Sequence, residues 1–204
     1  MPGRRVLLAS RNPHKLAELR DLLADLPIEI VSPDDVGIEE EPAEADIEAW
    51  DSFAANALAK AAWFRARSGL PTLADDSGLC VDALEGGPGV FSRRFAPASS
   101  IGEDGQDPAN NSHLLKLLHG RPEAERGAHY GCALALIDDG MQVVTSGRVD
   151  GRIATEELGA GGFGYDPLFV VPEFERTFGE LPPEVKAERS HRARAVTAMR
   201  TWLA

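Results

Sequence analysis

Residues 6–15 read VLLASRNPHK, and this segment leads from a buried strand into a helix. The apolar run 6–9 has the length of a short strand, and polar residues follow it at once. Asn12 is suited to cap a helix because its side chain can accept backbone N–H groups, and Pro13 suits the first helical position. The helix that follows has one apolar face, made of leucines at helical spacing: Leu16, Leu19, Leu22, Leu23 and Leu26.

The elements that come next can be predicted from local composition. Pro27 ends the first helix, and the segment 28–31 predicts a second strand. The acidic segment 34–46 is expected to form an exposed loop. An alanine-rich stretch then predicts a helix over about 47–67, which the turn residues 68–71 end.

The later part of the chain predicts a hairpin, a further strand and a closing helix. The strand-like runs 130–137 and 141–149 flank Asp-Asp-Gly at 138–140, which is a strong hairpin signal. A short strand is expected at 168–171 and a basic helix over 190–203. This order predicts an α/β fold in which helices flank a mixed sheet.

The middle of the chain is less regular. Short strands are expected at 72–74 and 79–81, with a glycine-containing turn at 75–78 between them. The polar segment 97–112 is expected to be an irregular insertion before a short helix at 112–119.

The charge balance limits the classes of partner. The chain has 204 residues, with 21 Lys and Arg against 33 Asp and Glu and a formal net charge of −12. Nucleic acid is therefore not expected as a partner, because phosphate neutralisation dominates its binding. The first apolar run is too short for a signal peptide or a membrane helix. Cys80 and Cys132 are expected to be reduced core thiols, and we expect one soluble, cytoplasmic domain over 1–204 without membrane contact.

The junction between the first strand and the first helix is a candidate phosphate site. A helix N-terminus presents backbone N–H groups and the positive end of the helix dipole, so it favours phosphate. Lys15 adds a positive charge in the first turn. The alternative is a plain N-cap beside a surface lysine. The candidate phosphate-binding residues are Ser10, Arg11, Asn12, Pro13, His14 and Lys15.

Adjacent carboxylates form a second candidate. Asp75 and Asp76 precede Ser77 and a glycine. Mg²⁺ prefers oxygen ligands and usually takes one or two carboxylates together with substrate phosphate. A carboxylate placed there can also accept a proton from an attacking water. The alternative is an aspartate-rich turn whose side chains bond the backbone.

The glycine-rich segment 159–167, GAGGFGYDP, is a third candidate. It contains a formal GxGxxG, but a strand follows too soon for the helix of a dinucleotide-binding unit. Phe163 and Tyr165 can stack on a nucleobase, and Asp166 can bond a base edge. The alternative is a tight loop whose aromatic rings fill the core.

Two further polar groups complete the candidates. Lys186, His191 and Arg192 belong to a basic patch near the C-terminus, for which a solvated helix face is the alternative. A polar stripe also recurs at every fourth residue of the alanine-rich helix: Glu48, Ser52, Asn56 and Lys60.

Taken in their order, these motifs resemble those of the inosine/xanthosine triphosphate pyrophosphatase family, and the likeness covers nearly the whole chain. The chain departs from the family at Ala55, where glutamate is frequent, and in residues 98–112, which are longer and more polar than usual. The matching segments are Ser10-x-Asn12-x-x-Lys15, Glu48 with Ser52-Phe53-x-x-Asn56-Ala57-x-x-Lys60-Ala61, Ala74-Asp75-Asp76-Ser77-Gly78-Leu79, Gly87-Pro88-Gly89-Val90-Phe91-Ser92-x-Arg94, Gly161-Gly162-Phe163-Gly164-Tyr165-Asp166-Pro167, and Lys186 with Ser190-His191-Arg192.

The resemblance implies an elongated mixed sheet with two lobes and a nucleotide cleft between them. It also implies a homodimer that uses Mg²⁺ to cleave non-canonical purine nucleoside triphosphates (ITP, dITP and XTP) to the monophosphate and pyrophosphate. Two alternatives stay open: a pyrophosphatase for other modified nucleoside triphosphates, such as pyrimidines, and a nucleotide-binding module without turnover.

The resemblance further implies a role for each motif. Residues 10–15 would hold phosphates, and Ser77 would contact the substrate. Asp76 would be the proton acceptor and a metal ligand, with Glu48 and Asp75 also serving the metal. The nucleotide, chiefly its base end, would be bound by Phe163, Gly164, Tyr165, Asp166, Lys186, His191 and Arg192.

Overall fold

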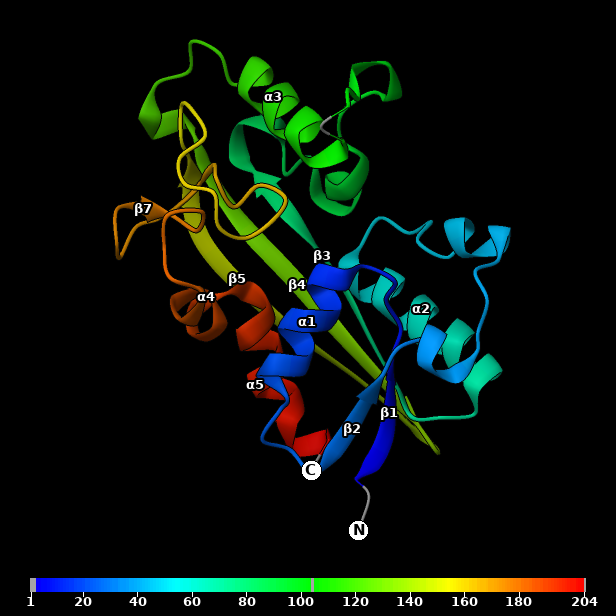
Figure 1. Ribbon diagram of the computed structural model, residues 1–204. Coiled ribbons are helices and arrows are strands. Elements are labelled where there is room, and N and C mark those ends of the chain that lie inside the picture. The colour runs from blue at the N-terminus through cyan, green and yellow to red at the C-terminus, as the bar shows by residue number, and fades with distance from the viewer. Residues whose placement is uncertain (1–2, 104, 204) are drawn as a thin grey trace. The chain divides into compact units, whose positions relative to one another are not determined.

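The structure is a computed structural model that describes residues 3–103 and 105–203 (Figure 1). Its strands are β1 (Arg4–Leu8), β2 (Ile28–Val31), β3 (Thr72–Val81), β4 (Gly127–Asp138), β5 (Met141–Ile153), β6 (Phe169–Val171) and β7 (Arg176–Thr177). Its α-helices are α1 (Pro13–Leu22), α2 (Phe53–Ser68), α3 (Gln106–Leu117), α4 (Pro183–Arg189) and α5 (His191–Leu203).

The strands form a mixed sheet in the order β2-β1-β3-β4-β5-β6-β7. β1 runs parallel to β2 and to β3, with Val6 opposite Ile30 and Leu8 opposite Leu73, whereas β6 is antiparallel to β5 and to β7. The hairpin between β4 and β5 turns at Gly140, whose φ of +69° a glycine adopts without steric cost. The predicted α/β class with a mixed sheet is confirmed.

Two compact units divide the chain. The first unit contains residues 3–76, 132–147 and 191–203, and the second contains 77–131 and 148–190. The chain passes from one unit to the other within β3, β4 and β5, and again at the start of α5. The expectation of a single domain stays a prediction.

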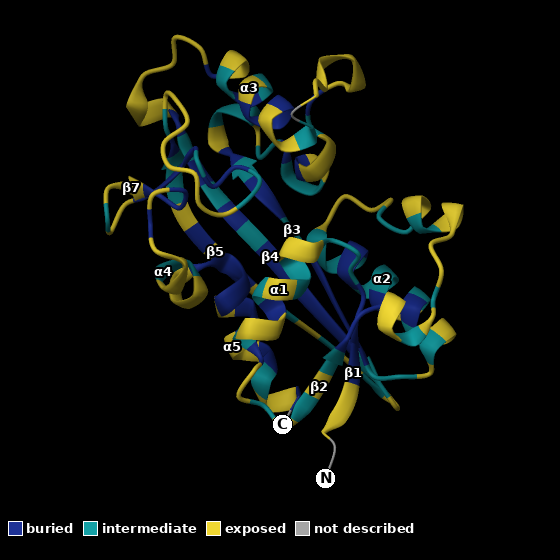
Figure 2. Ribbon diagram, viewed as in Figure 1, coloured by how far each residue is buried: buried dark blue, intermediate teal, exposed yellow. Residues whose placement is uncertain are grey.

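Alternation along β1 explains how the core of the first unit is built. Val6 and Leu8 pack in one hydrophobic cluster with α1 and α5, whereas Leu7 and Ala9 pack in a second cluster with α2. Successive side chains of a strand point to opposite faces, so this uninterrupted apolar run is buried on both sides (Figure 2). Full burial of each leucine-sized side chain contributes about 1.5–3 kcal/mol to stability.

The core of the second unit is aromatic. The ring of Tyr130 on β4 lies 4.7 Å from that of Phe169 on β6, and the rings of Phe169 and Phe178 stack at 5.6 Å. Leu114 and Leu118 at the end of α3 belong to the same cluster. This packing fixes both α3 and the strand that follows the glycine-rich segment.

The helix expected over 47–67 begins later, at Phe53. The Ser52 hydroxyl oxygen accepts the backbone N–H of Ala55 at 3.2 Å, so Ser52 caps the helix and fixes its start. Glu48 and Ser52 therefore lie outside α2. The expectation of a four-residue polar stripe along one helix face is wrong for these two residues.

Two expectations for the middle of the chain are also wrong. β3 continues through 75–78 without the predicted turn. Gly78 serves close packing instead, because a Cβ atom there would lie 2.3 Å from the carbonyl oxygen of Gly89. The helix predicted at 112–119 already begins at Gln106 and uses part of the polar insertion.

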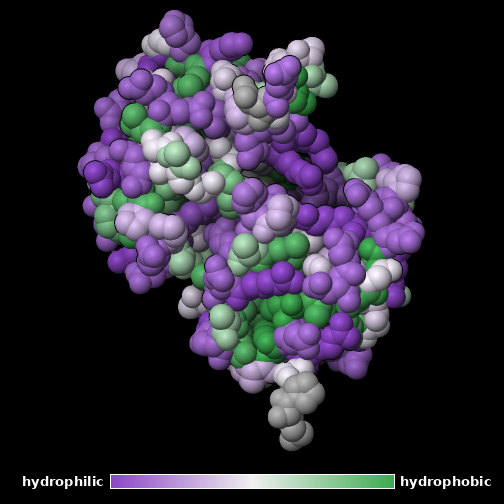
Figure 3. Space-filling model, viewed as in Figure 1, coloured by the Kyte–Doolittle hydropathy of each residue, from purple (hydrophilic) through white to green (hydrophobic). Residues whose placement is uncertain are grey.

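The surface and the cysteines agree with the composition. No helix within residues 3–103 and 105–203 is long and apolar enough to cross a membrane. Hydrophilic residues predominate on the face shown in Figure 3. Both cysteines are free thiols, as predicted. Cys132 is buried in the core, whereas Cys80 is only half-buried and not the core residue that the sequence predicts.

Candidate active site

Asn12 caps α1 and holds the first backbone N–H groups of the helix. Its Oδ1 accepts the N–H of His14 at 2.9 Å and that of Lys15 at 3.3 Å, while Pro13 takes the first helical position. The hydroxyl of Ser10 accepts the N–H of Asn12 at 3.2 Å. The predicted cap is confirmed, and a phosphate at this terminus would compete with the Asn12 side chain for the same donors.

The Arg11 side chain is engaged by the acidic segment. Its Nε and one terminal nitrogen donate to the two carboxylate oxygens of Glu44 at 2.9 and 2.8 Å, and the other terminal nitrogen donates to Asp34 at 2.6 Å. The hydrogen bond from Arg11 is the main reason that the pKa of Glu44 is lowered. In this structure the Arg11 guanidinium therefore binds the acidic segment, and its predicted role in phosphate binding stays a prediction.

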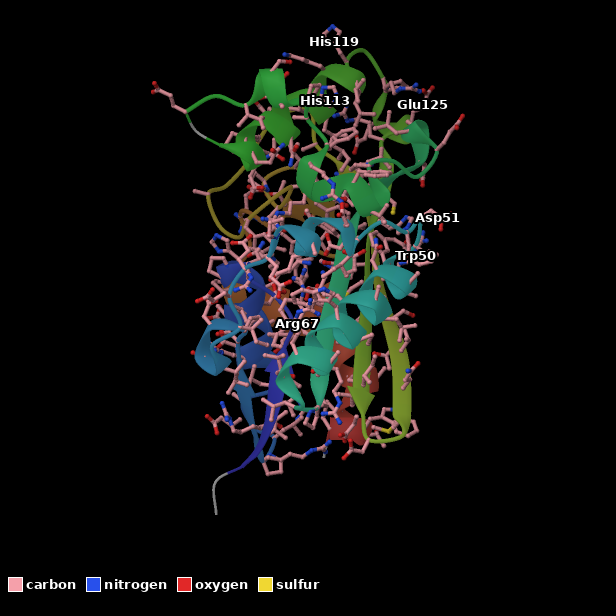
Figure 4. All side chains as sticks on the ribbon, turned by 90° about the vertical axis from the view of Figure 1, so that its right-hand side faces the viewer. Trp50, Asp51, Arg67, His113, His119 and Glu125 are labelled. Atoms are coloured by element: carbon pink, nitrogen blue, oxygen red, sulfur yellow. The ribbon has the colours of Figure 1, made fainter. Side chains whose placement is uncertain are left out.

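A second arginine holds the same segment from α2. Arg67, which is labelled in Figure 4, pairs with Glu41 at 3.2 Å, and its guanidinium lies 3.4 Å from the centre of the Trp63 ring. The segment carries two short 3-10 helices, η1 (Asp34–Val36) and η2 (Pro42–Asp46). The segment is largely exposed, as expected, and it contains these two short helices. The ion pairs of Arg11 and Arg67 connect it to α2 and to the start of α1.

Asp75 is buried between two cations. Lys15 Nζ lies 3.0 Å from Asp75 Oδ1, and Arg192 Nε lies 3.1 Å from Asp75 Oδ2. Burial alone would raise the pKa of Asp75, but the charges of Lys15, Arg192 and Lys60 outweigh it and lower the pKa. Asp75 therefore stays ionised and holds Lys15 in place.

Asp76 lies in a different environment although it is the next residue. Its Oδ2 accepts a hydrogen bond from Asn56 Nδ2 at 2.9 Å. Burial raises the pKa of Asp76 more than the nearby charges of Lys60 and Lys15 lower it. A carboxylate whose pKa is raised above the usual value is a better proton acceptor than an ordinary aspartate.

Lys60 brings the acids of this unit together. It forms an ion pair with Glu48, and its Nζ donates to the backbone oxygen of Asp75 at 3.0 Å. Burial would lower the pKa of Lys60, but the charges of Glu48, Asp75 and Asp76 raise it. The sequence predicts Lys60 only as part of a polar stripe, and its position among three carboxylates comes from the structure.

Arg192 lies inside the first unit. Its side chain is 2% exposed, and beyond Asp75 it pairs with Glu18 at 2.5 Å. Burial would lower the pKa of Arg192, but Asp75 and Glu18 raise it, so the group keeps its charge. Glu18 is absent from the sequence-based candidates. Its only signal is its place one turn after Lys15 on α1.

The glycine-rich segment is organised by Asp166 in the second unit. Asp166 Oδ2 accepts the backbone N–H of Phe163 at 2.8 Å and pairs with Lys186 at 2.5 Å. Lys186 Nζ also lies 4.3 Å from the centre of the Phe163 ring, in a cation–π arrangement. The hydroxyl of the buried Tyr165 donates to the carbonyl of Ser92 at 2.8 Å.

The structure thus divides the predicted residues between the two units. The second unit holds Ser77, half-buried on β3, and the base-side residues Phe163, Gly164, Tyr165, Asp166 and Lys186. The first unit holds Ser10, Arg11, Asn12, Pro13, His14, Lys15, Glu48, Asp75, Asp76, His191 and Arg192.

The carboxylates of the first unit suit a hard cation held by two protein ligands. Within residues 3–103 and 105–203, no group of three or more His, Cys, Asp or Glu side chains is arranged to hold a metal. Mg²⁺ usually takes only one or two carboxylates and completes its shell with water and substrate phosphate. Glu48 and Asp76 both lie near the charge of Lys60. The two oxygens of Asp75 instead face Lys15 and Arg192.

Known proteins resemble this chain over nearly its whole length. A protein of Nitrosomonas europaea named dITP/XTP pyrophosphatase is 43% identical over 198 residues, which cover 96% of this chain and 92% of that protein. A protein of the same name from Burkholderia pseudomallei is 45% identical over 198 residues, with coverages of 96% and 91%.

Solved structures agree. A HAM1 protein from Coxiella burnetii superposes with a TM-score of 0.84 at 36% identity and covers 98% of each chain. A nucleoside-triphosphatase, dITP/XTP pyrophosphatase, from Mycobacterium abscessus gives a TM-score of 0.73 at 45% identity, with 96% of this chain and 98% of that chain covered. The Ham1 family model matches residues 6–202, and this chain therefore belongs to the Ham1 family.

Proposed function

We propose that this chain hydrolyses the non-canonical purine nucleoside triphosphates ITP, dITP and XTP to the monophosphate and pyrophosphate, with Mg²⁺ as cofactor. The observation that carries the proposal is the buried cluster in which Lys15 pairs with Asp75, Lys60 pairs with Glu48, and Asn56 orients Asp76. Relatives named dITP/XTP pyrophosphatase, at 43% and 45% identity, support the same reaction and substrate class.

The phosphates would be bound where β1 leads into α1. Lys15 supplies the positive charge, and its ion pair with Asp75 holds the ammonium group before substrate arrives. The positive end of the α1 dipole favours phosphate as well, although the N–H groups of His14 and Lys15 already donate to Asn12. This junction is shaped by Ser10, Asn12, Pro13 and His14. Ser77 is proposed as a further substrate contact.

The water that attacks phosphorus would lose its proton to the carboxylate of Asp76. Asn56 fixes the orientation of that carboxylate by its hydrogen bond to Oδ2. Burial raises the pKa of Asp76 and so increases its proton affinity, while the charge of neighbouring Lys60 favours the ionised form. General-base catalysis of this kind contributes about 10²- to 10⁴-fold in rate.

Glu48 and Asp76 would hold the Mg²⁺ ion, which withdraws electron density from phosphorus and stabilises the leaving pyrophosphate. Asp75 is also a predicted metal ligand. Because Lys15 and Arg192 take both of its oxygens, we assign it instead to positioning Lys15.

The base end of the nucleotide would be bound by the glycine-rich segment and the basic residues near the C-terminus. Phe163 offers a ring for stacking, held by Lys186 on one face. Asp166 is also a predicted base contact, but its buried carboxylate accepts the Phe163 N–H and pairs with Lys186, so we assign it to holding the segment in shape. Gly164 and Tyr165 are proposed to complete this part of the site. His191 and Arg192 are also predicted base-side residues, but both are buried in the first unit, and Arg192 pairs with Asp75 and Glu18, so we assign Arg192 instead to holding Asp75.

We further propose that the protein is a cytoplasmic homodimer that binds neither nucleic acid nor membrane. The family resemblance supports the dimer, and the net charge of −12 argues against nucleic acid. Sedimentation velocity over a concentration series measures the dimer directly.

The test of the proposed function is pyrophosphate release from a panel of ITP, XTP, dITP, ATP, GTP and a modified pyrimidine triphosphate, each with and without Mg²⁺. The expected result is release from the first three substrates, in the presence of Mg²⁺, well above release from the others. Preference for the pyrimidine, or nucleotide binding without release, would contradict the proposal.

A further inference from the structure

Both peptide groups of Gly164 are held by the same helix of the second unit. The Gly164 N–H donates to Asp107 Oδ2 at 2.9 Å, and the Gly164 carbonyl accepts from Asn111 Nδ2 at 3.2 Å. Asp107 and Asn111 both belong to α3 and are four residues apart, so they lie on one face of the helix. α3 therefore holds the centre of the glycine-rich segment by two hydrogen bonds to Gly164.

Asn111 also connects the glycine-rich segment to the residues just before it. Its Nδ2 makes a second hydrogen bond, to Glu157 Oε2 at 3.1 Å. The side chain is buried, and its Oδ1 has no hydrogen-bond partner among the described residues. Among the described residues, the Asn111 side chain therefore forms its hydrogen bonds through Nδ2, which donates to two acceptors seven positions apart in the sequence.

Gly164 lies in the turn that begins at Phe163. Phe163 and Asp166 enclose a tight turn, in which the Asp166 N–H donates to the Phe163 carbonyl at 3.3 Å. Gly164 lies inside that turn with φ at +62°. Fixing both of its peptide groups fixes the two peptide planes beside it, and the first of these planes carries Phe163.

We propose that Asp107 and Asn111 are positioning residues that set nucleobase affinity and selectivity. The inference rests on the proposed function, in which the glycine-rich segment binds the base. Glycines give this segment many accessible conformations, so a base would bind it more weakly if nothing ordered it beforehand. Asp107 is exposed, so its contribution lies in the hydrogen bond to the segment rather than in the core.

Isosteric variants separate positioning from packing. Asn111→Asp keeps the shape but replaces the donor by an ionised acceptor that faces Glu157 and the Gly164 carbonyl. We expect inosine monophosphate to bind about tenfold more weakly, from the loss of two hydrogen bonds. Asp107→Ala should weaken it about threefold, whereas Asp107→Asn, which keeps an oxygen acceptor, should bind as the parent does.

The experiment measures binding of inosine monophosphate and of pyrophosphate by calorimetry, in Mg²⁺ buffer, together with KM and kcat for ITP and GTP. For Asn111→Asp we expect a raised KM for ITP, a lower ITP-over-GTP ratio in kcat/KM, and unchanged kcat and pyrophosphate affinity. Ser112→Ala, an exposed neighbour on α3, is the matched control and should behave as the parent.

Different results would contradict the proposed function and the positioning role of Asp107 and Asn111. A parent protein that does not hydrolyse ITP contradicts the proposed function. A parent that hydrolyses ITP, with folded Asn111→Asp and Asp107→Ala variants that match it in monophosphate affinity and selectivity, contradicts the positioning role. Equal losses of monophosphate and pyrophosphate affinity would also contradict it, because they indicate general damage to the fold.

Discussion

Arg192 Nε lies 3.1 Å from Asp75 Oδ2, and this ion pair is almost completely buried. Glu18 pairs with the same arginine, and Lys15 pairs with the other oxygen of Asp75. Two acids and two bases therefore alternate in the interior of the first unit. Each charge depends on its neighbours, because an uncompensated buried charge is strongly destabilising.

Removal of the arginine should destabilise the protein. Arg192→Ala leaves the buried carboxylate of Asp75 without one of its two cationic partners, and we expect the free energy of unfolding to fall by about 3–5 kcal/mol. Urea unfolding of parent and variant measures this change. Arg192→Lys keeps the charge but not the planar fork, so it should recover only part of the loss. An unfolding midpoint in Arg192→Ala equal to that of the parent would contradict the account.

Asp75 should contribute stability that depends on pH. Its pKa is lowered in the folded protein, whereas an unfolded aspartate has a pKa of about 3.9. Stability from Asp75 is therefore fully present above about pH 4 and is lost as the pH falls toward the folded pKa. The difference in unfolding free energy between parent and Asp75→Asn should be largest at neutral pH and should narrow below pH 4. A difference that does not change with pH would show that Asp75 acts through shape alone.

Lys60 should set the acidic limb of the activity profile. Its charge lowers the pKa of Asp76, which burial raises. Removing that charge in Lys60→Met should raise the pKa of Asp76 further, so the acidic limb of kcat/KM for ITP should move to higher pH. Lys60→Arg keeps the charge and should leave the limb near its parent position. If the acidic limb stays at the same pH in both variants, the charge of Lys60 does not set the pKa of the proton acceptor.

Metal removal should abolish turnover reversibly. EDTA-treated protein is expected to release no pyrophosphate from ITP, and Mg²⁺ should restore activity better than Zn²⁺, because the donor set is made of carboxylates without His or Cys. Glu48→Gln should raise the Mg²⁺ concentration needed for half-maximal activity by about tenfold or more. Activity that survives EDTA, or an unchanged Mg²⁺ requirement in Glu48→Gln, would contradict the assignment.

Local signals explain which parts of the fold could be predicted from sequence. Asn12 and Pro13 act on the backbone beside them, so the start of α1 is correct. The β4–β5 hairpin is correct because its turn residues, 138–140, are also local. The alanine run correctly predicts α2, but the start of the helix is set by Ser52, whose side chain caps it, so the expected start at 47 is too early. The sequence around Gly78 indicates a turn, whereas the structure requires glycine there for close packing against Gly89.

The contacts within the candidate site could not be predicted from the sequence. The sequence places the acids and Lys15 in motifs, but it cannot show which charged side chains form ion pairs with one another. Glu18 meets Arg192 across 174 positions of the chain, and Asn111 meets Gly164 across 53. Such partners have no periodicity or spacing that marks them. The different environments of Asp75 and Asp76, which are adjacent in sequence, likewise depend on groups brought together by folding.

The central claim is that Asp76 accepts the proton of the water that attacks a nucleoside triphosphate. The most direct measurement is single-turnover pyrophosphate release from ITP at saturating Mg²⁺, for parent and Asp76→Asn, with the thermal unfolding of both proteins as a control on folding. We expect Asp76→Asn to keep its fold and to release pyrophosphate at least about 10²-fold more slowly. A folded Asp76→Asn protein that releases pyrophosphate at nearly the parent rate would contradict the account.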